Sequence, residues 1–428
     1  MRPTLALRRM MKVAVEGCCH GELDAIYQHI TFLERKNRCK VDLLLMCGDF
    51  EGLRNEQDMK CMARPEKYTA MGDFHKYYSK QKVAPILTLV IGGNHEASNY
   101  MWELYHGGWL APNIYYLGNS GCVQVNGVRI GAASGIYKSH HYNLGHWETL
   151  PYDRSSMRSI YHQRDYDFQK LSMLPKPSIF LSHDWPMNIP FYGDVEDLLQ
   201  RKSRHQIEQI GSPPSMELLR ALKPDWWFSA HMHTKFAATV EHKMGDASGP
   251  GSGSEELNAA SPAASTSAGL QAPSVTQFLA LDKCLPNREF LEVIDVPIPE
   301  NSSPANASRK PSKSNGPPVF SYDPQWLAIL RAFHPWLTLR RYQEPLPEKA
   351  QLRKLVEKEL EWVKENVPKK IGEDMRVERC QQFSQTAPMR GFEVGDKKQQ
   401  PPAYTNPQTE ALCSLLELEN KINPAPRA

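Results

Sequence analysis

The sequence lacks the long apolar runs that membrane proteins need. No stretch of about 18 uncharged apolar residues occurs in the chain, so neither a transmembrane helix nor a membrane partner is expected. The sequence also lacks a large excess of charge of either sign, because the formal net charge is only +3. This balance permits a nucleic-acid partner but does not require one.

The cysteines lack the spacing that is typical of secreted proteins. The nine cysteines are odd in number and scattered along the chain, without the spacing of a disulfide framework. We therefore expect a reducing compartment.

Composition divides the 428 residues into more than one unit. Residues 244–275 are rich in Ser, Ala, Gly and Pro, which predicts a flexible insertion, and strand-like sequence resumes at Thr276. Apolar positions at helical spacing predict a helix over 348–366. The expected units are an N-terminal extension (1–10), a first domain (11–297), a linker (298–318), a C-terminal domain (319–420) and a tail (421–428).

Short apolar runs repeatedly end in residues that can bind metals. The runs are KVAVEGCCHG, VDLLLMCGDF, ILTLVIGGNHE, SIFLSHDWP and WWFSAHMH. Helix-like segments such as 23–38 lie between them, and this alternation predicts a layered α/β fold. Asn126-Gly127 is typical of a hairpin turn. Two sheets packed face to face are therefore expected.

The polar residues at these strand ends form a candidate site, because strand ends in an open sheet meet in one crevice. The candidates are Cys18, His20, Asp49, Asn94, His95, Glu96, His183, His231 and His233. Seven such groups can hold two cations, and we expect Asp49 to bridge them. Two cations suit hydrolysis of a phosphate ester, because together they neutralise the phosphoryl oxygens and generate a nucleophile.

In their order, these residues resemble the calcineurin-like metallophosphoesterase signature D-x-H, G-D, G-N-H-[DE], H and G-H-x-H. Two positions depart from it: Cys18 stands in place of the aspartate, and Ala230 in place of the glycine. A thiolate is a softer ligand than a carboxylate, so it lowers the preference for Mg²⁺ and favours Fe²⁺ or Zn²⁺, with Mn²⁺ also compatible.

The C-x-H start is typical of one branch of that superfamily, the lariat debranching enzymes. The stretches EGCCHGELD, GGWLAPNIYYLG, SGIYKSHHY and FLALDKCLPNREFLEV are similar to that family. The resemblance is dense through residues 12–243 and 276–296 and looser in the C-terminal part. It implies an α/β fold: a two-sheet metallophosphoesterase sandwich flanked by helices, with a smaller, mainly helical C-terminal domain.

Carried over by residue, the resemblance implies two divalent metal ions, Fe²⁺ and/or Zn²⁺ being favoured. It assigns Cys18, His20 and His233 to one metal, Asn94, His183 and His231 to the other, and Asp49 to both. His95 is then left free as a catalytic general acid or electrostatic stabiliser. Glu96 either orients His95 or is a solvated loop acid.

Residues 134–165 interleave aromatic and cationic side chains, which suits RNA because bases can stack and cations can hold phosphates. The alternative is an aromatic-rich loop packed on the core. The resemblance implies a lariat recognition loop here. Candidate RNA-binding residues are Tyr137, Lys138, His140, Tyr142, Arg154 and Arg158.

The implied activity is hydrolysis of the 2′-5′ phosphodiester at the branch point of excised intron lariat RNA. Branched RNA is the expected substrate, and splicing-associated proteins are candidate partners. A nuclear location follows from the substrate, with shuttling between nucleus and cytoplasm as an open alternative. Two other interpretations are a two-metal phosphoesterase for a different nucleotide or phosphodiester, and a catalytically silent RNA-binding scaffold.

Overall fold

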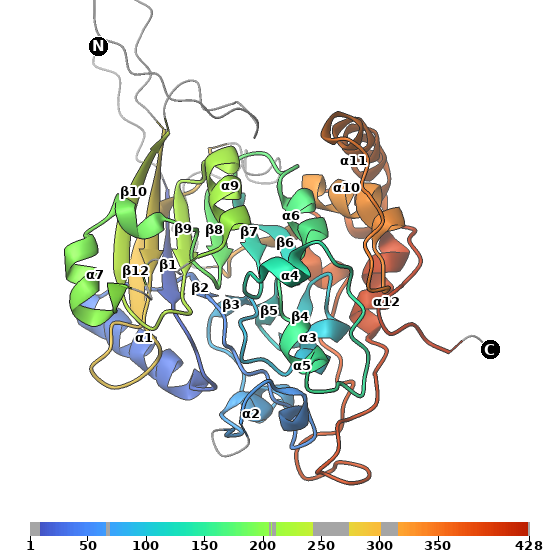
Figure 1. Ribbon diagram of the computed structural model, residues 1–428, viewed down its shortest axis with the longest axis horizontal. Helices are drawn as coiled ribbons and strands as arrows, with labels where there is room; N and C mark the ends of the chain where they lie inside the picture. The colour runs from blue at the N-terminus through green and yellow to red at the C-terminus, as the bar shows by residue number, and fades with distance from the viewer. Residues whose placement is uncertain are drawn as a thin grey trace, which may run out of the picture.

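The structure is a computed structural model (Figure 1) that describes residues 9–65, 69–204, 207, 211–242, 274–300 and 316–426. The expected N-terminal extension up to residue 8, the expected insertion up to residue 273, and most of the expected linker lie outside the described residues. Among the described helices, none is both long and apolar enough to cross a bilayer.

The first sheet has a parallel centre and antiparallel edges. Its order is β12 (Leu291–Pro297), β1 (Met10–Glu16), β2 (Leu43–Met46), β3 (Leu87–Val90), β5 (Ile114–Tyr116) and β4 (Gly108–Ala111). The four central strands run parallel, and β12 and β4 are antiparallel to their neighbours. Every residue of β2 and β3 is buried, as the continuous apolar runs of covered parallel strands require.

The second sheet has seven strands and is also mixed. Its order is β10 (Phe236–His242), β11 (Ser274–Ala280), β9 (Trp226–Ser229), β8 (Ile179–Ser182), β7 (Val128–Ala133), β6 (Ser120–Val125) and β13 (Phe320–Tyr322). The expected hairpin joins β6 to β7. Asn126 and Gly127 both have positive φ, at 50° and 79°, the conformation that favours Asn-Gly in such turns.

The two sheets pack face to face around one large apolar core, so the expected sandwich is confirmed. Val13, Leu45 and Leu89 of the first sheet share this core with Ile130 and Phe228 of the second. A smaller core covers the outer face of the first sheet, where Leu44 and Val90 meet Ile26 and Ile30. Both faces of the central strands are thereby packed against apolar side chains, and the loops that follow these strands start from a buried sheet.

Helices flank the sheets in the layers seen in Figure 1. They are α1 (Leu23–Asn37), α2 (Phe74–Tyr78), α3 (Ser98–Glu103), α4 (Ser139–Tyr142), α5 (Ser156–Ser159), α6 (Asp165–Leu171), α7 (Val195–Arg201), α9 (Pro213–Leu222), α10 (Pro324–Phe333), α11 (Lys349–Ile371) and α12 (Pro407–Leu415). Short 3₁₀ turns cover Asp58–Cys61, Ile189–Tyr192, His334–Trp336 and Val377–Arg379. Helix α11 runs past the expected end at 366 and through Pro368, and it buries Val367 and Ile371.

The C-terminal segment combines three helices with long irregular stretches and is continuous with the second sheet. Its first strand, β13, pairs antiparallel with β6, and α10, α11 and α12 gather on the right of Figure 1. Gln381 is fully buried. Its amide oxygen accepts hydrogen bonds from the Tyr115 and Tyr322 hydroxyls, both at 2.8 Å. Its amide nitrogen donates to the Gly107 carbonyl at 2.9 Å.

Candidate metal centre

The candidate residues follow five strands at one end of the sandwich. Cys18 and His20 follow β1, Asp49 follows β2, Asn94 and His95 follow β3, His183 follows β8, and His231 and His233 follow β9. The first three strands belong to one sheet and the last two to the other. The site is therefore built where parallel strands of both sheets end.

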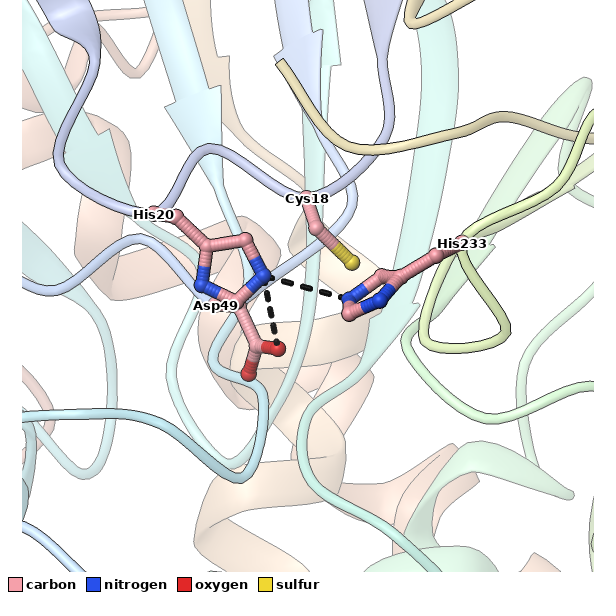
Figure 2. A group of neighbouring side chains, drawn as sticks. All are labelled: Cys18, His20, Asp49 and His233. Atoms are coloured by element: carbon pink, nitrogen blue, oxygen red, sulfur yellow. Dashed lines mark hydrogen bonds and ion pairs between the residues drawn. The ribbon is translucent and has the colours of Figure 1, made fainter. Parts of the chain in front are cut away.

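Four of the candidates form a tight cluster, drawn in Figure 2. Ligand atoms of Cys18, His20, Asp49 and His233 all lie within 4.8 Å of one another. The Nε2 atoms of His20 and His233 are 3.2 Å apart, and His20 Nε2 lies 3.8 Å from Asp49 Oδ2. The Cys18 sulfur is buried and accepts the His231 backbone N–H at 3.2 Å.

A second set of donors lies on the other side of the Asp49 carboxylate. His183 Nε2 is 3.4 Å from Asp49 Oδ1 and 3.2 Å from Asn94 Oδ1. The rings of His183 and His231 have centroids 4.9 Å apart. Asp49 thus faces one set with Oδ2 and the other with Oδ1, as a carboxylate shared between two cations would.

The proton positions on two histidines test whether these groups fit cations. His183 Nδ1 lies 2.8 Å from the Cys47 carbonyl oxygen, which can only accept, so Nδ1 carries the proton. In the neutral ring, Nε2 then points a lone pair at two oxygen acceptors, Asn94 Oδ1 and Asp49 Oδ1. Burial lowers the pKa of His183, which disfavours the doubly protonated alternative. A cation between these atoms removes the conflict.

His20 repeats this arrangement on the other side. Its Nδ1 donates to Glu51 Oε1 at 2.9 Å, which leaves the Nε2 lone pair facing His233 and Asp49. A carboxylate or a carbonyl behind a histidine is the usual support of a metal ligand. Together with the thiol of Cys18, the donor set therefore fits divalent metal ions.

Electrostatics at the centre favour a charged Asp49. Burial alone would raise the pKa of this carboxyl, but His183, His95 and His20 together hold the pKa well below its usual value. Burial and the negative charge of Asp49 raise the pKa of the Cys18 thiol well above its ordinary value. A bound cation would reverse that shift, because a coordinating thiol is deprotonated.

Backbone strain is concentrated at the same residues. His20, Asp49, His231 and His233 all have positive φ, at 46°, 46°, 62° and 47°. Each such residue costs on the order of 1–3 kcal/mol, and clusters of them are typical of functional sites. A Cβ at Gly93 would lie 2.2 Å from Asp49 Oδ1, so only glycine fits before Asn94.

His95 lies beside the donor sets and outside them. Its backbone N–H donates to Asp49 Oδ1 at 2.9 Å, and its ring centroid is 5.7 Å from that of His20. Its Nδ1 is buried without a hydrogen-bond partner among the described residues.

Glu96 fits neither of its expected roles. It is buried, and it accepts the backbone N–H groups of Phe50, Glu51 and Gly93 at 2.8, 3.0 and 2.8 Å. Burial, followed by the negative charge of Asp49, raises its pKa to about 8. Its described bonds tie the loop after β2 to the loop after β3, and none reaches the His95 ring.

The candidate recognition loop begins beside the centre. The Gly135 N–H donates to the Gly92 carbonyl at 2.8 Å, and the Tyr137 N–H donates to Asp184 Oδ2 at 3.1 Å. Tyr137 and Tyr142 are half-buried with ring centroids 5.5 Å apart. The remaining RNA candidates, Lys138, His140, Arg154 and Arg158, are exposed. The loop thus combines packed aromatic rings with free cationic side chains.

Two residues that support the candidate site were not predicted from the sequence. Glu51 is buried, supports His20 and has a positive φ of 57°. Asp184 is buried and anchors the start of the candidate recognition loop. The available signals were their positions, Glu51 two residues after Asp49 and Asp184 directly after His183.

Comparisons with known proteins cover most of the chain. Residues 11–235 match the calcineurin-like phosphoesterase family, and residues 273–421 match the C-terminal domain of lariat debranching enzymes. Lariat debranching enzyme A of Xenopus laevis is 45% identical over 95% of this chain and 70% of its own length. The lariat debranching enzyme of Arabidopsis thaliana is 44% identical over 97% of this chain and 88% of its own length.

The human lariat debranching enzyme is similar to the same degree, at 44% identity over 95% of this chain and 69% of its own length. The resemblance inferred from the motifs is thereby confirmed. The chain belongs to the lariat debranching enzyme family and carries the calcineurin-like phosphoesterase domain of that family.

Proposed function

We propose that this protein is a metal-dependent phosphodiesterase that hydrolyses the 2′-5′ phosphodiester at the branch point of excised intron lariat RNA. The observation that carries this proposal is the pair of donor sets on either side of Asp49. Relatives named lariat debranching enzyme, similar over nearly the whole chain, support the choice of substrate.

Cys18, His20 and His233 would hold one divalent cation, Asn94, His183 and His231 a second, and Asp49 both. When bound, such a pair neutralises phosphoryl oxygens and makes water nucleophilic near neutral pH. The Cys18 thiolate favours Fe²⁺ and/or Zn²⁺, and Mn²⁺ is compatible. Metal analysis of protein purified without oxygen, paired with turnover, tests this choice.

The chain itself supplies the proton and the positioning. Hydroxide forms a new bond to phosphorus as the bond from phosphorus to the branch-point 2′ oxygen breaks, and the departing oxygen takes a proton from His95. An imidazole can hold and release a proton near neutral pH, and Nδ1 of His95 has no other partner among the described residues. The products are linear RNA with a 5′ phosphate and a free 2′ hydroxyl.

The exposed cations of the candidate recognition loop are suited to RNA phosphates, and its half-buried tyrosines to stacked bases. We assign these contacts to Lys138, Arg154 and Arg158, and to Tyr137, His140 and Tyr142. We also place the reaction in the nucleus, where splicing-associated proteins are candidate partners. Imaging of the tagged protein tests the location, and a wholly cytoplasmic signal would contradict it.

Purified protein incubated with branched RNA and with linear 3′-5′ RNA tests the activity. We expect the protein to cleave the branched RNA and to leave the linear RNA intact. Equal cleavage of both RNAs would contradict the 2′-5′ preference. Turnover of a chromogenic phosphodiester without opening of branched RNA would indicate a different phosphodiesterase, and RNA binding without any hydrolysis would indicate a silent scaffold.

A further inference from the structure

A groove lined by basic residues shares His233 with the candidate metal centre. It encloses about 520 Å³, begins at His233, and is lined by the cationic side chains of Arg201, Lys202, Lys235, Lys283 and Arg288. Two acids, Asp282 and Glu289, also line it. We call this feature the basic groove. Its lining residues come from the end of α7, from the loop between β9 and β10, and from the loop that joins β11 to β12.

Lys283 is held beside a candidate metal ligand by the backbone. Lys283 and Cys18 form an isolated parallel β-bridge. The Cys18 N–H donates to the Asp282 carbonyl at 3.3 Å, and the Cys284 N–H donates to the Cys18 carbonyl at 3.1 Å. The groove and the centre therefore share one rigid wall.

Part of the positive charge in the groove is not balanced by carboxylates. Lys235 pairs with Glu289 at 3.1 Å, and Arg288 pairs with Asp282 at 3.2 Å. Lys202 and Lys283 have no carboxylate partner within the described ranges. Both are half-buried. Burial lowers the pKa of Lys202, and the charges of Arg288 and Lys283 lower it further, whereas Asp282 opposes them.

The basic groove and the candidate recognition loop flank the metal centre on opposite sides. The groove follows β11 and the recognition loop follows β7, and in the sheet β9 and β8 lie between these two strands. His231 and His233 follow β9, and His183 follows β8. A branched RNA has three arms that diverge from one nucleotide. The recognition loop can therefore face one arm while another arm leaves through the groove.

We propose that the basic groove binds backbone phosphates of one arm of the branched RNA through Lys202 and Lys283. This inference rests on the proposed function and extends it to a second RNA-binding surface, which is far in sequence from the candidate recognition loop. A phosphate chain suits the groove because it supplies the missing negative charge at a position continuous with the centre.

The test uses a labelled branched RNA in which a triazole replaces the branch phosphodiester, so that metal-loaded protein binds it without cleavage. Affinity is measured over a range of salt concentrations for the wild type and for the double variant Lys202→Gln, Lys283→Gln. Each phosphate contact in single-stranded RNA contributes about 0.7 to the slope of log affinity against log salt. We expect the slope to fall by about 1.4, and affinity at physiological salt to fall about tenfold.

A matched control neutralises two other lysines. Lys354 and Lys358 are exposed on α11, and the variant Lys354→Gln, Lys358→Gln removes the same total charge. We expect its affinity and salt slope to equal those of the wild type. Equal losses in both double variants would overturn the proposal, because they would reflect net charge alone. Wild-type behaviour of the groove variant would overturn it as well.

Truncated RNAs separate this proposal from the proposed function. The affinities of the wild type and of the groove variant are measured for a set of RNAs, each of which lacks one of the three arms. We expect the two proteins to differ on every RNA except the one that lacks the arm held in the groove. A difference of equal size on all truncated RNAs would overturn the assignment to one arm. Failure of the wild type to open natural branched RNA would instead contradict the proposed function.

Discussion

One carboxylate links every part of the candidate centre. Asp49 Oδ1 accepts the backbone N–H of His95 at 2.9 Å and lies 3.4 Å from His183 Nε2. Its Oδ2 lies 3.8 Å from His20 Nε2. The position of His95 is therefore tied to the residue that both proposed metals would share.

Replacing His95 by alanine should lower kcat by about 10²- to 10⁴-fold, the usual contribution of a general acid. Binding of the triazole-linked branched RNA should remain within about twofold, because the ring is not among the proposed metal ligands. Single-turnover cleavage and fluorescence anisotropy measure the two effects.

The variant His95→Gln serves as the companion to alanine, because it keeps hydrogen-bonding capacity and cannot transfer a proton. Metal content must equal that of the wild type in both variants. Unchanged turnover, or loss of turnover explained by lost metal, would remove the assigned role.

Replacing Glu51 by glutamine should weaken metal binding about 10- to 100-fold, because a neutral amide oxygen accepts the Nδ1–H of His20 more weakly than the carboxylate does and makes His20 a less basic ligand. Dissociation constants measured by competition with a chelator check this expectation. Arg64 also contacts Glu51, at 2.7 Å, so Arg64→Gln is a control that leaves His20 supported. Equal metal affinity in Glu51→Gln and Arg64→Gln would contradict the role of Glu51.

Residue types at strand ends could be predicted from the sequence, but the supporting contacts could not. Cys18, Asp49 and His233 each follow an apolar run, and that pattern was sufficient to expect their convergence. Glu96 was misread, because its three backbone partners depend on how two loops fold together. The residues next to Glu96 in the sequence do not indicate such contacts.

At the scale of elements, the strands and long helices lie where the hydrophobic pattern of the sequence predicts them, whereas the short strand β13 could not be predicted from such a pattern. Its three residues are too few to show alternation, and they form a strand because β6 offers an edge to pair with. Helix α11 extends beyond its expected end because burial of Val367 and Ile371 offsets the loss of the hydrogen bond that Pro368 cannot donate. Tertiary packing decided both cases.

The tie between β13 and the rest of the molecule can be tested at Gln381. Replacing Gln381 by leucine leaves the Tyr115 and Tyr322 hydroxyls and the Gly107 and Gln408 carbonyls without this buried partner. With about 1 kcal/mol for each of the four lost bonds, the free energy of unfolding should fall by about 4 kcal/mol. Urea denaturation measures this change.

The exposed Gln351 on α11 provides the matched control, because Gln351→Leu changes the same atoms in solvent. Its effect should stay within about 0.5 kcal/mol. Equal destabilisation by both substitutions would contradict the assignment of Gln381 as the link between the C-terminal segment and the sheet.

At the scale of the whole molecule, acid should destabilise the fold through histidines far from the metal centre. Burial lowers the pKa of His106 to about 3 and that of His334 to about 4. Below about pH 6.5 the unfolded chain binds protons that the folded protein excludes. These residues therefore contribute stability that is complete above that pH and is lost as the pH falls toward 4.

Urea denaturation at pH 7, 6 and 5 checks this dependence. The variant His106→Gln, His334→Gln should lose less stability than the wild type between the highest and the lowest of these pH values. Parallel stability curves for the two proteins would contradict the assignment. Comparison of the two proteins also cancels any contribution from metal ligands, which are the same in both.

The pairing of β10 with β11 has a practical consequence. Its last registered partners are His242 and Ser274, which sit opposite each other across the ladder. The strand pairing therefore holds the two ends of the intervening chain side by side. Each doubling of the length of that chain adds only about 0.6 kcal/mol to the entropic cost of closing the loop. A fluorescent reporter or affinity tag engineered between them would leave the catalytic architecture in place, which offers a handle for single-molecule work.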